Sequence, residues 1–128
     1  MNEKKILVVD DQPQIRQMFK RSLERSGYSV VTAESAEQSL EIMSDTPCSV
    51  LFLDLDLPGM NGIDLCKIIR KQWPMAIVHA VTGYATLYQL IECREAGFED
   101  YFTKPVKMAE LRKAAELAFE KLERWKTG

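Results

Sequence analysis

Short apolar runs alternate along the chain with segments in which apolar residues recur every three or four positions. Three of the runs, at residues 6–9, 50–53 and 77–81, are almost wholly apolar, which is typical of strands buried on both faces. Two others, at residues 28–32 and 101–102, are mixed in polarity, as edge strands are. The pattern therefore predicts five strands, with the three apolar ones at the centre of a sheet.

Amphipathic helical segments separate these strands, and most of them carry a start or stop signal. Pro13 suits the first turn of the first helix. Ser35 and Gln38 form a capping-box pattern for the second helix, and Asn61 is placed to cap the third. A weaker fourth helix ends near Gly97, and a fifth follows the last strand.

Five strands that alternate with five helices predict an α/β fold. We expect a doubly wound, five-stranded parallel sheet with helices on both faces. Placing the polar strands at the edges gives the flavodoxin-like strand order 2-1-3-4-5. In that arrangement a ligand site lies beyond the carboxyl ends of the first and third strands, where the chain connections diverge.

Three acidic residues fall at these two strand ends. Asp10 and Asp11 follow the first strand, and Asp54 ends the third. Carboxylates crowded together repel one another unless a cation lies among them, and Mg²⁺ both takes oxygen ligands and binds phosphate. In the alternative interpretation, one of the first two acids caps a helix and Asp54 is simply solvated. A single cap explains one acid and leaves the others unexplained.

Two further polar side chains end strands on the same side of the predicted sheet. Thr82 brings a hydroxyl at the end of the fourth strand, and Lys104 brings an ammonium after the fifth. Acids for a metal, a hydroxyl and an ammonium together suit a phosphoryl group. A nucleotide is not expected, because neither G-x-x-x-x-G-K nor G-x-G-x-x-G occurs. Flavin mononucleotide is not expected either, since the acids would repel its phosphate.

Four segments at these strand ends resemble the motifs of one protein family. They read VVDDQP at residues 8–13, LDLDLPGMNG at 53–62, VTG at 81–83 and YFTKP at 101–105. As an ordered set they resemble the receiver domains of response regulators in two-component signal transduction. The resemblance runs from residue 4 to about residue 120, and it predicts a single receiver domain over residues 1–128.

The resemblance implies a role for each acid. Asp54 would accept a phosphoryl group from a phosphohistidine of a sensor histidine kinase or a phosphotransfer protein. Mg²⁺, or Mn²⁺ in its place, would be bound by Asp10, Asp11 and Asp54 and by the backbone carbonyl of Asp56.

The same resemblance implies a switch. Lys104 would pair with Asp54 and then with a phosphoryl oxygen, and Thr82 would hydrogen-bond another. The movement of Thr82 would let Tyr101 turn inward and change the surface formed by the fourth helix, the last strand and the fifth helix, where a partner or a second copy of the chain would bind. The bond between Lys104 and Pro105 resembles the cis peptide of the family.

Two rival functions remain open from the sequence. Asp54-Leu55-Asp56 resembles the D-x-D motif of haloacid-dehalogenase-type phosphatases, but Asp54 ends the third strand, and Pro58 replaces the expected Thr or Val. A pseudo-receiver would bind partners without accepting phosphate, although all the acids, Thr82 and Lys104 are present. We therefore expect a switch that catalyses its own phosphorylation and dephosphorylation but turns over no external substrate. Asp56 and Tyr84 stand at positions associated with phosphoryl lifetime.

Composition and charge narrow the choice of partners and location. With 17 basic and 19 acidic residues, well mixed, the net charge is −2, so no direct nucleic-acid binding is expected. The first apolar run is too short for a signal peptide or a membrane span, so a cytoplasmic location is expected. Cys48, Cys66 and Cys93 form no C-x-x-C pair and should be reduced thiols. His79 should be a packed core residue.

The last helix carries apolar residues at alternating spacings of three and four, as in a coiled-coil seam: Met108, Leu111, Ala115, Ala118, Leu122 and Trp125. Through Ala118 we favour the buried face of an ordinary amphipathic helix. Leu122 and Trp125 are expected to extend past the core. The turns at about residues 120–128 would then form a dimer helix, or a linker to an output domain in a longer parent chain.

Overall fold

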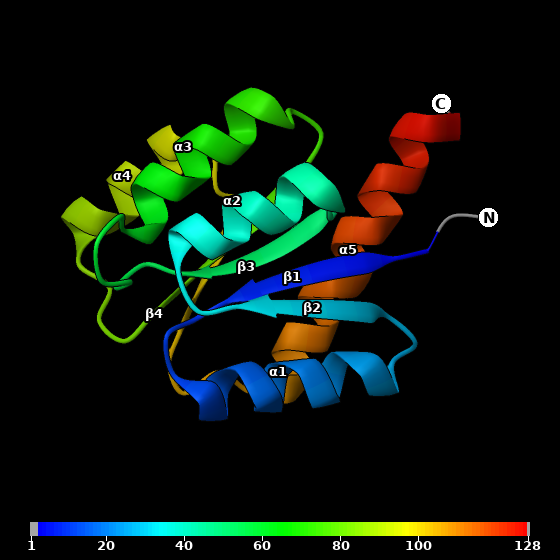
Figure 1. Cartoon of the computed structure of the whole chain (residues 1–128), viewed down its shortest axis with the longest axis horizontal. Coiled ribbons are helices and arrows are strands. Elements are labelled where there is room, and N and C mark those ends of the chain that lie inside the picture. The colour runs from blue at the N-terminus through cyan, green and yellow to red at the C-terminus, as the bar shows by residue number, and fades with distance from the viewer. Residues whose placement is uncertain (1–2, 128) are drawn as a thin grey trace.

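A five-stranded parallel sheet in the order β2-β1-β3-β4-β5 forms the centre of the computed structural model, which describes residues 3–127 (Figure 1). The predicted strand order and the two edge strands are confirmed. The elements, in chain order, are β1 (Lys5–Val9), α1 (Pro13–Arg25), β2 (Ser29–Ala33), α2 (Ala36–Asp45), β3 (Val50–Asp54), α3 (Gly62–Gln72), β4 (Ile77–Thr82), α4 (Leu87–Ala96), β5 (Asp100–Thr103) and α5 (Met108–Thr127).

Alternation along the central strands divides the core into two layers, because successive side chains of a strand point to opposite faces. Leu7 and Leu51 belong to the layer under α2, α3 and α4, whereas Ile6 and Phe52 belong to the layer under α1 and α5. Figure 1 shows α1 and α5 on one side of the sheet and the other three helices on the opposite side. Every residue of β3 and β4 is buried, which explains their continuous apolar runs.

The predicted helix starts are confirmed in detail. Ser35 Oγ accepts a hydrogen bond from the backbone N–H of Gln38 at 3.1 Å, and the Gln38 side chain accepts one from the N–H of Glu34 at 2.8 Å. Asn61 Oδ1 accepts from the N–H of Asp64 at 2.9 Å. These bonds satisfy amide groups that a helix start leaves without an intrahelical partner.

One face of α5 packs into the core. Leu111, Ala115 and Ala118 are buried against the sheet and α1, as the amphipathic interpretation predicts. Leu122 also packs against this layer, so the expectation that it leaves the core is wrong. Trp125 is 70% exposed and does extend past the core. A linker or dimer role for residues 120–128 stays a prediction, and residue 128 lies outside the described residues.

The histidine and the three cysteines that the sequence places in the interior are buried there. His79 is buried, stacks on Phe52 at 4.5 Å between ring centroids, and has Nδ1 3.1 Å from the Leu51 carbonyl oxygen. Burial lowers the pKa of His79 and raises the pKa of the Cys66 thiol to about 12. Cys48, Cys66 and Cys93 are all free and buried. Within residues 3–127, no helix is both long and apolar enough to cross a bilayer.

Candidate functional site

The three acids singled out from the sequence meet at the carboxyl edge of the sheet. Val9 pairs with Leu53 in the ladder between β1 and β3, so Asp10 and Asp54 follow side by side on neighbouring strands. Carboxylate oxygens of Asp10, Asp11 and Asp54 all lie within 4.8 Å of one another. Asp10 and Asp54 are buried, and Asp11 is exposed. Two buried acids at this separation require nearby positive charge.

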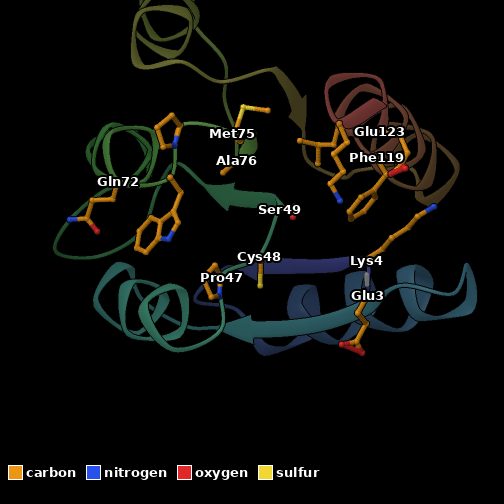
Figure 2. Close-up of a pocket in the computed structure, with 14 residues that line it drawn as sticks. Glu3, Lys4, Pro47, Cys48, Ser49, Gln72, Met75, Ala76, Phe119 and Glu123 are labelled. Atoms are coloured by element: carbon orange, nitrogen blue, oxygen red, sulfur yellow. The ribbon is translucent and has the colours of Figure 1, made fainter. Parts of the chain in front are cut away.

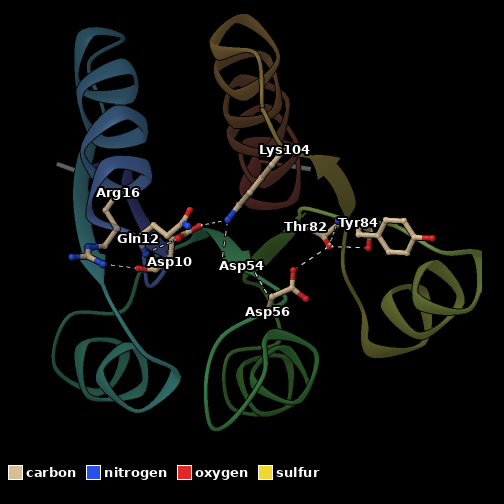
Figure 3. Close-up of polar contacts among 8 residues, drawn as sticks. All are labelled: Asp10, Gln12, Arg16, Asp54, Asp56, Thr82, Tyr84 and Lys104. Atoms are coloured by element: carbon tan, nitrogen blue, oxygen red, sulfur yellow. Dashed lines mark hydrogen bonds and ion pairs between the residues drawn. The ribbon is translucent and has the colours of Figure 1, made fainter.

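Lys104 supplies part of that charge. Its Nζ lies 3.0 Å from Asp10 Oδ2 and 3.6 Å from Asp54 Oδ2, and Figure 3 shows the ammonium between the two acids. The sequence led us to expect a pair with Asp54, but the closer contact is with Asp10. Burial acts to lower the pKa of Lys104, but its hydrogen bond to Asp10 and the charges of both acids outweigh burial and raise it. Lys104 is therefore an ammonium at neutral pH.

Asp54 is the acid with the most unfavourable surroundings. Burial raises its pKa above the usual value, and repulsion from Asp10 and Asp56 adds to the rise. The backbone N–H of Asp56, which donates to Asp54 Oδ1 at 3.0 Å, and the charge of Lys104 offset only part of it. The single ammonium of Lys104 does not balance the negative charge of the clustered carboxylates. The site therefore favours binding of a further cation.

The donor set fits a hard divalent cation. Mg²⁺ prefers oxygen ligands and is usually bound by one or two carboxylates together with phosphate and water. Asp10, Asp11 and Asp54 offer three carboxylates at the ends of two neighbouring strands, and Asp11 is the exposed one of the three. A contribution from the backbone carbonyl of Asp56 stays a prediction.

Thr82 lies at the end of β4 on the same edge, within a local hydrogen-bond group. Its Oγ1 accepts from the backbone N–H of Tyr84 at 3.2 Å, and it lies 3.2 Å from the Tyr84 carbonyl oxygen and 3.5 Å from Asp56 Oδ2. A hydroxyl has one proton, so it donates to only one of these two oxygens at a time. Because the contact with Asp56 is long, the Tyr84 carbonyl is the better acceptor.

The other predicted residues surround this edge. Tyr84 is 77% exposed, and Figure 3 shows its ring pointing away from Asp54. Tyr101 on β5 is 42% exposed, and its inward turn stays a prediction. The peptide bond between Lys104 and Pro105 is cis.

Gly62 has a positional role that the sequence analysis missed. A Cβ atom at this residue would lie 2.9 Å from Leu55 Cα and would also clash with the backbone carbonyl oxygen of Asp54. The first turn of α3 therefore packs directly on the peptide that follows Asp54. The glycine was visible in the motif, but only the packing of α3 on β3 gives its reason.

A hollow of about 480 Å³ lies at the opposite, amino edge of the sheet (Figure 2). Its apolar lining comes from the loops before β3 and β4 and from α5: Pro47, Cys48, Trp73, Met75, Phe119 and Leu122. None of the three clustered acids lines it. The chemistry predicted from the sequence therefore belongs to the carboxyl edge alone.

The Gly62→Ala substitution should destabilise the fold and disturb Asp54. Forcing a methyl group into closely packed backbone typically costs about 1–3 kcal/mol. Denaturant unfolding followed by circular dichroism measures this loss. Gly83→Ala is the matched control, because a Cβ at Gly83 would meet nothing within 4 Å. Equal unfolding midpoints for the two variants would contradict the packing role of Gly62.

The Asp54→Asn substitution should stabilise the chain at neutral pH in the absence of metal. The pKa of Asp54 is raised in the folded state. Its ionisation therefore lowers stability as pH rises through the folded pKa, and the amide removes this loss. We expect a Tm a few degrees higher than that of the wild type at pH 7–8. The difference should shrink on acidification towards the usual aspartate pKa. A Tm difference that grew on acidification would contradict the conclusion that ionised Asp54 destabilises the fold.

Comparisons with known proteins agree with this geometry. Residues 6–116 match the family described as "Response regulator receiver domain". Response regulator protein PilR of Pseudomonas aeruginosa is 31% identical over 118 residues, which is 92% of this chain and 26% of PilR. The transcriptional regulatory protein PhoP of Bacillus subtilis, for alkaline phosphatase synthesis, is 38% identical over 102 residues, which is 80% of this chain and 42% of PhoP.

Solved structures give the same result. A CheY-like response regulator receiver domain protein from Methanospirillum hungatei superposes with a TM-score of 0.89 at 32% identity, covering 96% of this chain and 99% of that one. A response regulator receiver domain protein from Clostridium thermocellum gives 0.88 at 32% identity, over 94% and 98% of the two chains. This chain spans between about a quarter and two fifths of the two curated relatives named above. It belongs to the response regulator receiver domain family.

Proposed function

We propose that this receiver domain is a phosphorylation-controlled switch in which Asp54 accepts a phosphoryl group from the phosphohistidine of a sensor histidine kinase or a phosphotransfer protein. The observation that carries the proposal is the cluster of three carboxylates within 4.8 Å of one another, with the ammonium of Lys104 in contact with two of them. Receiver domains bind Mg²⁺ through an acidic pocket of this kind.

The residues present account for each part of the transfer. A carboxylate oxygen of Asp54 attacks phosphorus, an acyl phosphate bond forms, and the bond from phosphorus to the histidine nitrogen breaks with its electron pair leaving on the imidazole. Asp10, Asp11 and Asp54 would hold Mg²⁺, or Mn²⁺, which when bound would supply positive charge to the phosphoryl oxygens. Lys104 moves its ammonium from the carboxylates towards a phosphoryl oxygen, and Thr82 donates its hydroxyl proton to another.

The switch begins at Thr82. Its hydroxyl is bound to the backbone of Tyr84 in the loop before α4, so turning towards a phosphoryl oxygen gives up those bonds. The loop and the start of α4 then change position, and Tyr101 turns inward. A local change in charge thereby reaches the surface formed by α4, β5 and α5.

That surface has the character of a partner-binding face. Five large apolar or aromatic side chains are exposed on or beside α4 and β5: Tyr84, Leu87, Tyr88, Ile91 and Tyr101. An exposed apolar patch on a soluble domain commonly marks a protein interface. We propose that it binds a second copy of the chain or an output domain of a longer parent protein. Sedimentation of the phosphorylated chain separates self-association from binding of another protein.

Receiver domains of response regulators are generally not turnover enzymes, and we propose that this one only phosphorylates and dephosphorylates itself. Against the D-x-D phosphatase stands the place of Asp54, at the end of β3 and not of the first strand. Against a pseudo-receiver stands the contact of Lys104 with both buried acids.

Incubation with acetyl phosphate and Mg²⁺, followed by intact mass spectrometry, tests the proposal. We expect the wild type to gain one phosphoryl group, and Asp54→Asn and a chelated sample to gain none. Lack of an adduct on the wild type would favour the pseudo-receiver. Steady release of phosphate from an excess of a free phosphate ester would favour the phosphatase.

We also propose that Tyr84, together with Asp56, sets the lifetime of the phosphoryl group. A bulky ring that folds over the acyl phosphate would exclude water and slow hydrolysis. The Tyr84→Ala substitution should then speed the loss of phosphate several-fold, measured on the purified phosphorylated protein. Tyr88→Ala, which removes a similarly exposed ring near the start of α4, is the control. An unchanged rate in Tyr84→Ala would refute the screening idea.

A further inference from the structure

We propose that Arg16 is a positioning residue that fixes the acidic end of β1 for cation binding. The inference rests on the proposed function, because it concerns the same metal site. Arg16 lies in the first turns of α1, outside every motif that the sequence analysis singled out. Its side chain is only 17% exposed, which is unusual for an arginine at the edge of an acidic cluster.

The contact that matters is with the backbone of Asp10. Arg16 Nη1 donates a hydrogen bond to the Asp10 carbonyl oxygen at 2.7 Å (Figure 3). This carbonyl belongs to the peptide group that joins Asp10 to Asp11, and a peptide group is planar. By holding that plane, Arg16 sets the direction in which the chain carries Asp11 away from the strand end.

Asp10 is held at each of its other polar groups as well. Its N–H donates to the Ala33 carbonyl oxygen at 3.1 Å, its Oδ1 accepts from the Gln12 N–H at 2.9 Å, and its Oδ2 lies 3.0 Å from Lys104 Nζ. Asp11, in contrast, makes no side-chain hydrogen bond or ion pair to any residue that the structure describes. One bond therefore restrains the peptide group on each side of Asp11: Arg16 holds the Asp10–Asp11 peptide, and the Gln12 N–H, by donating to Asp10 Oδ1, holds the Asp11–Gln12 peptide.

The second terminal nitrogen of Arg16 contacts the loop between β2 and α2. Nη2 lies 3.9 Å from Glu34 Oε2, and the N–H of Glu34 donates to the Gln38 side chain at the start of α2. Glu34 is 70% exposed, so this ion pair is weak. We therefore assign the positioning role to the bond between Arg16 and Asp10. A substitution of Glu34 tests the two contacts of Arg16 separately.

Charge and position predict opposite outcomes when Arg16 is replaced. A guanidinium close to the end of β1 repels a metal ion bound there, so an effect of charge alone makes removal of Arg16 tighten Mg²⁺ binding. A positioning role makes removal weaken it, because the Asp10–Asp11 peptide is released. Loss of a group that orients metal ligands typically weakens metal binding by about 10–100-fold.

The experiment is a calorimetric titration of the whole chain with MgCl₂ at fixed ionic strength. We expect about a 10-fold larger Kd for Arg16→Met, and an intermediate value for Arg16→Lys, which keeps the charge but lacks the forked donor. Glu34→Gln should stay within about two-fold of the wild type, since it leaves the bond to Asp10 in place. Thermal unfolding without metal identifies any variant that fails to fold, and Arg16→Lys then replaces Arg16→Met.

Phosphorylation by acetyl phosphate gives a second readout. The Mg²⁺ concentration for half-maximal rate should rise with the Kd in Arg16→Met, while the rate at saturating Mg²⁺ falls much less. Unchanged or tighter Mg²⁺ binding in a folded Arg16→Met chain overturns the positioning role. Failure of the wild type itself to bind Mg²⁺ would instead defeat the proposed function, so the two failures are distinct.

Discussion

Two buried carboxylates on adjacent strands impose the constraint on which the rest of the site depends. Asp10 and Asp54 cannot both be ionised in the interior without a positive group close by. Lys104 meets this need only in part, and the pKa of Asp54 stays raised. The site is therefore left with an unbalanced negative charge, which a bound cation would offset.

The parallel sheet is what makes such crowding possible. Because all five strands run in the same direction, their carboxyl ends meet at one edge, and residues far apart in the chain become neighbours there. The packing of α3 on the Asp54–Leu55 peptide, which only a glycine at position 62 permits, holds β3 in place. The bond from Arg16 to the Asp10 carbonyl does the same for β1. Both restraints act on the backbone, so the acids keep their positions despite their repulsion.

The same edge connects the site to a surface that faces solvent. Thr82 ends β4 among the buried residues, yet its hydroxyl is bonded to the backbone of Tyr84 at the exposed start of the next connection. Beyond it, Leu87 and Tyr88 are about three-quarters exposed at the start of α4. The Thr82 hydroxyl can donate either to Asp56 Oδ2, on the side of the acids, or to the Tyr84 carbonyl oxygen, on the side of the exposed residues of α4. In the proposed function, this arrangement carries an event at Asp54 to a partner.

The pattern of apolar and polar residues by itself determined the fold class and the central strands, because a strand buried on both faces has an uninterrupted apolar run. The strand order followed from placing the two polar strands at the edges of a flavodoxin-like sheet. The predicted parallel topology also placed five polar residues at one edge of the sheet, because the carboxyl ends of parallel strands lie on the same side: Asp10, Asp11, Asp54, Thr82 and Lys104. Only the tertiary structure decided that Lys104 lies closer to Asp10 than to Asp54, that Leu122 packs against the core, and why position 62 excludes a side chain. The hydrogen bond from Arg16 to the Asp10 carbonyl was likewise visible only in the tertiary structure. Those features depend on distances between elements and on backbone groups, which have no signature in the order of residue types.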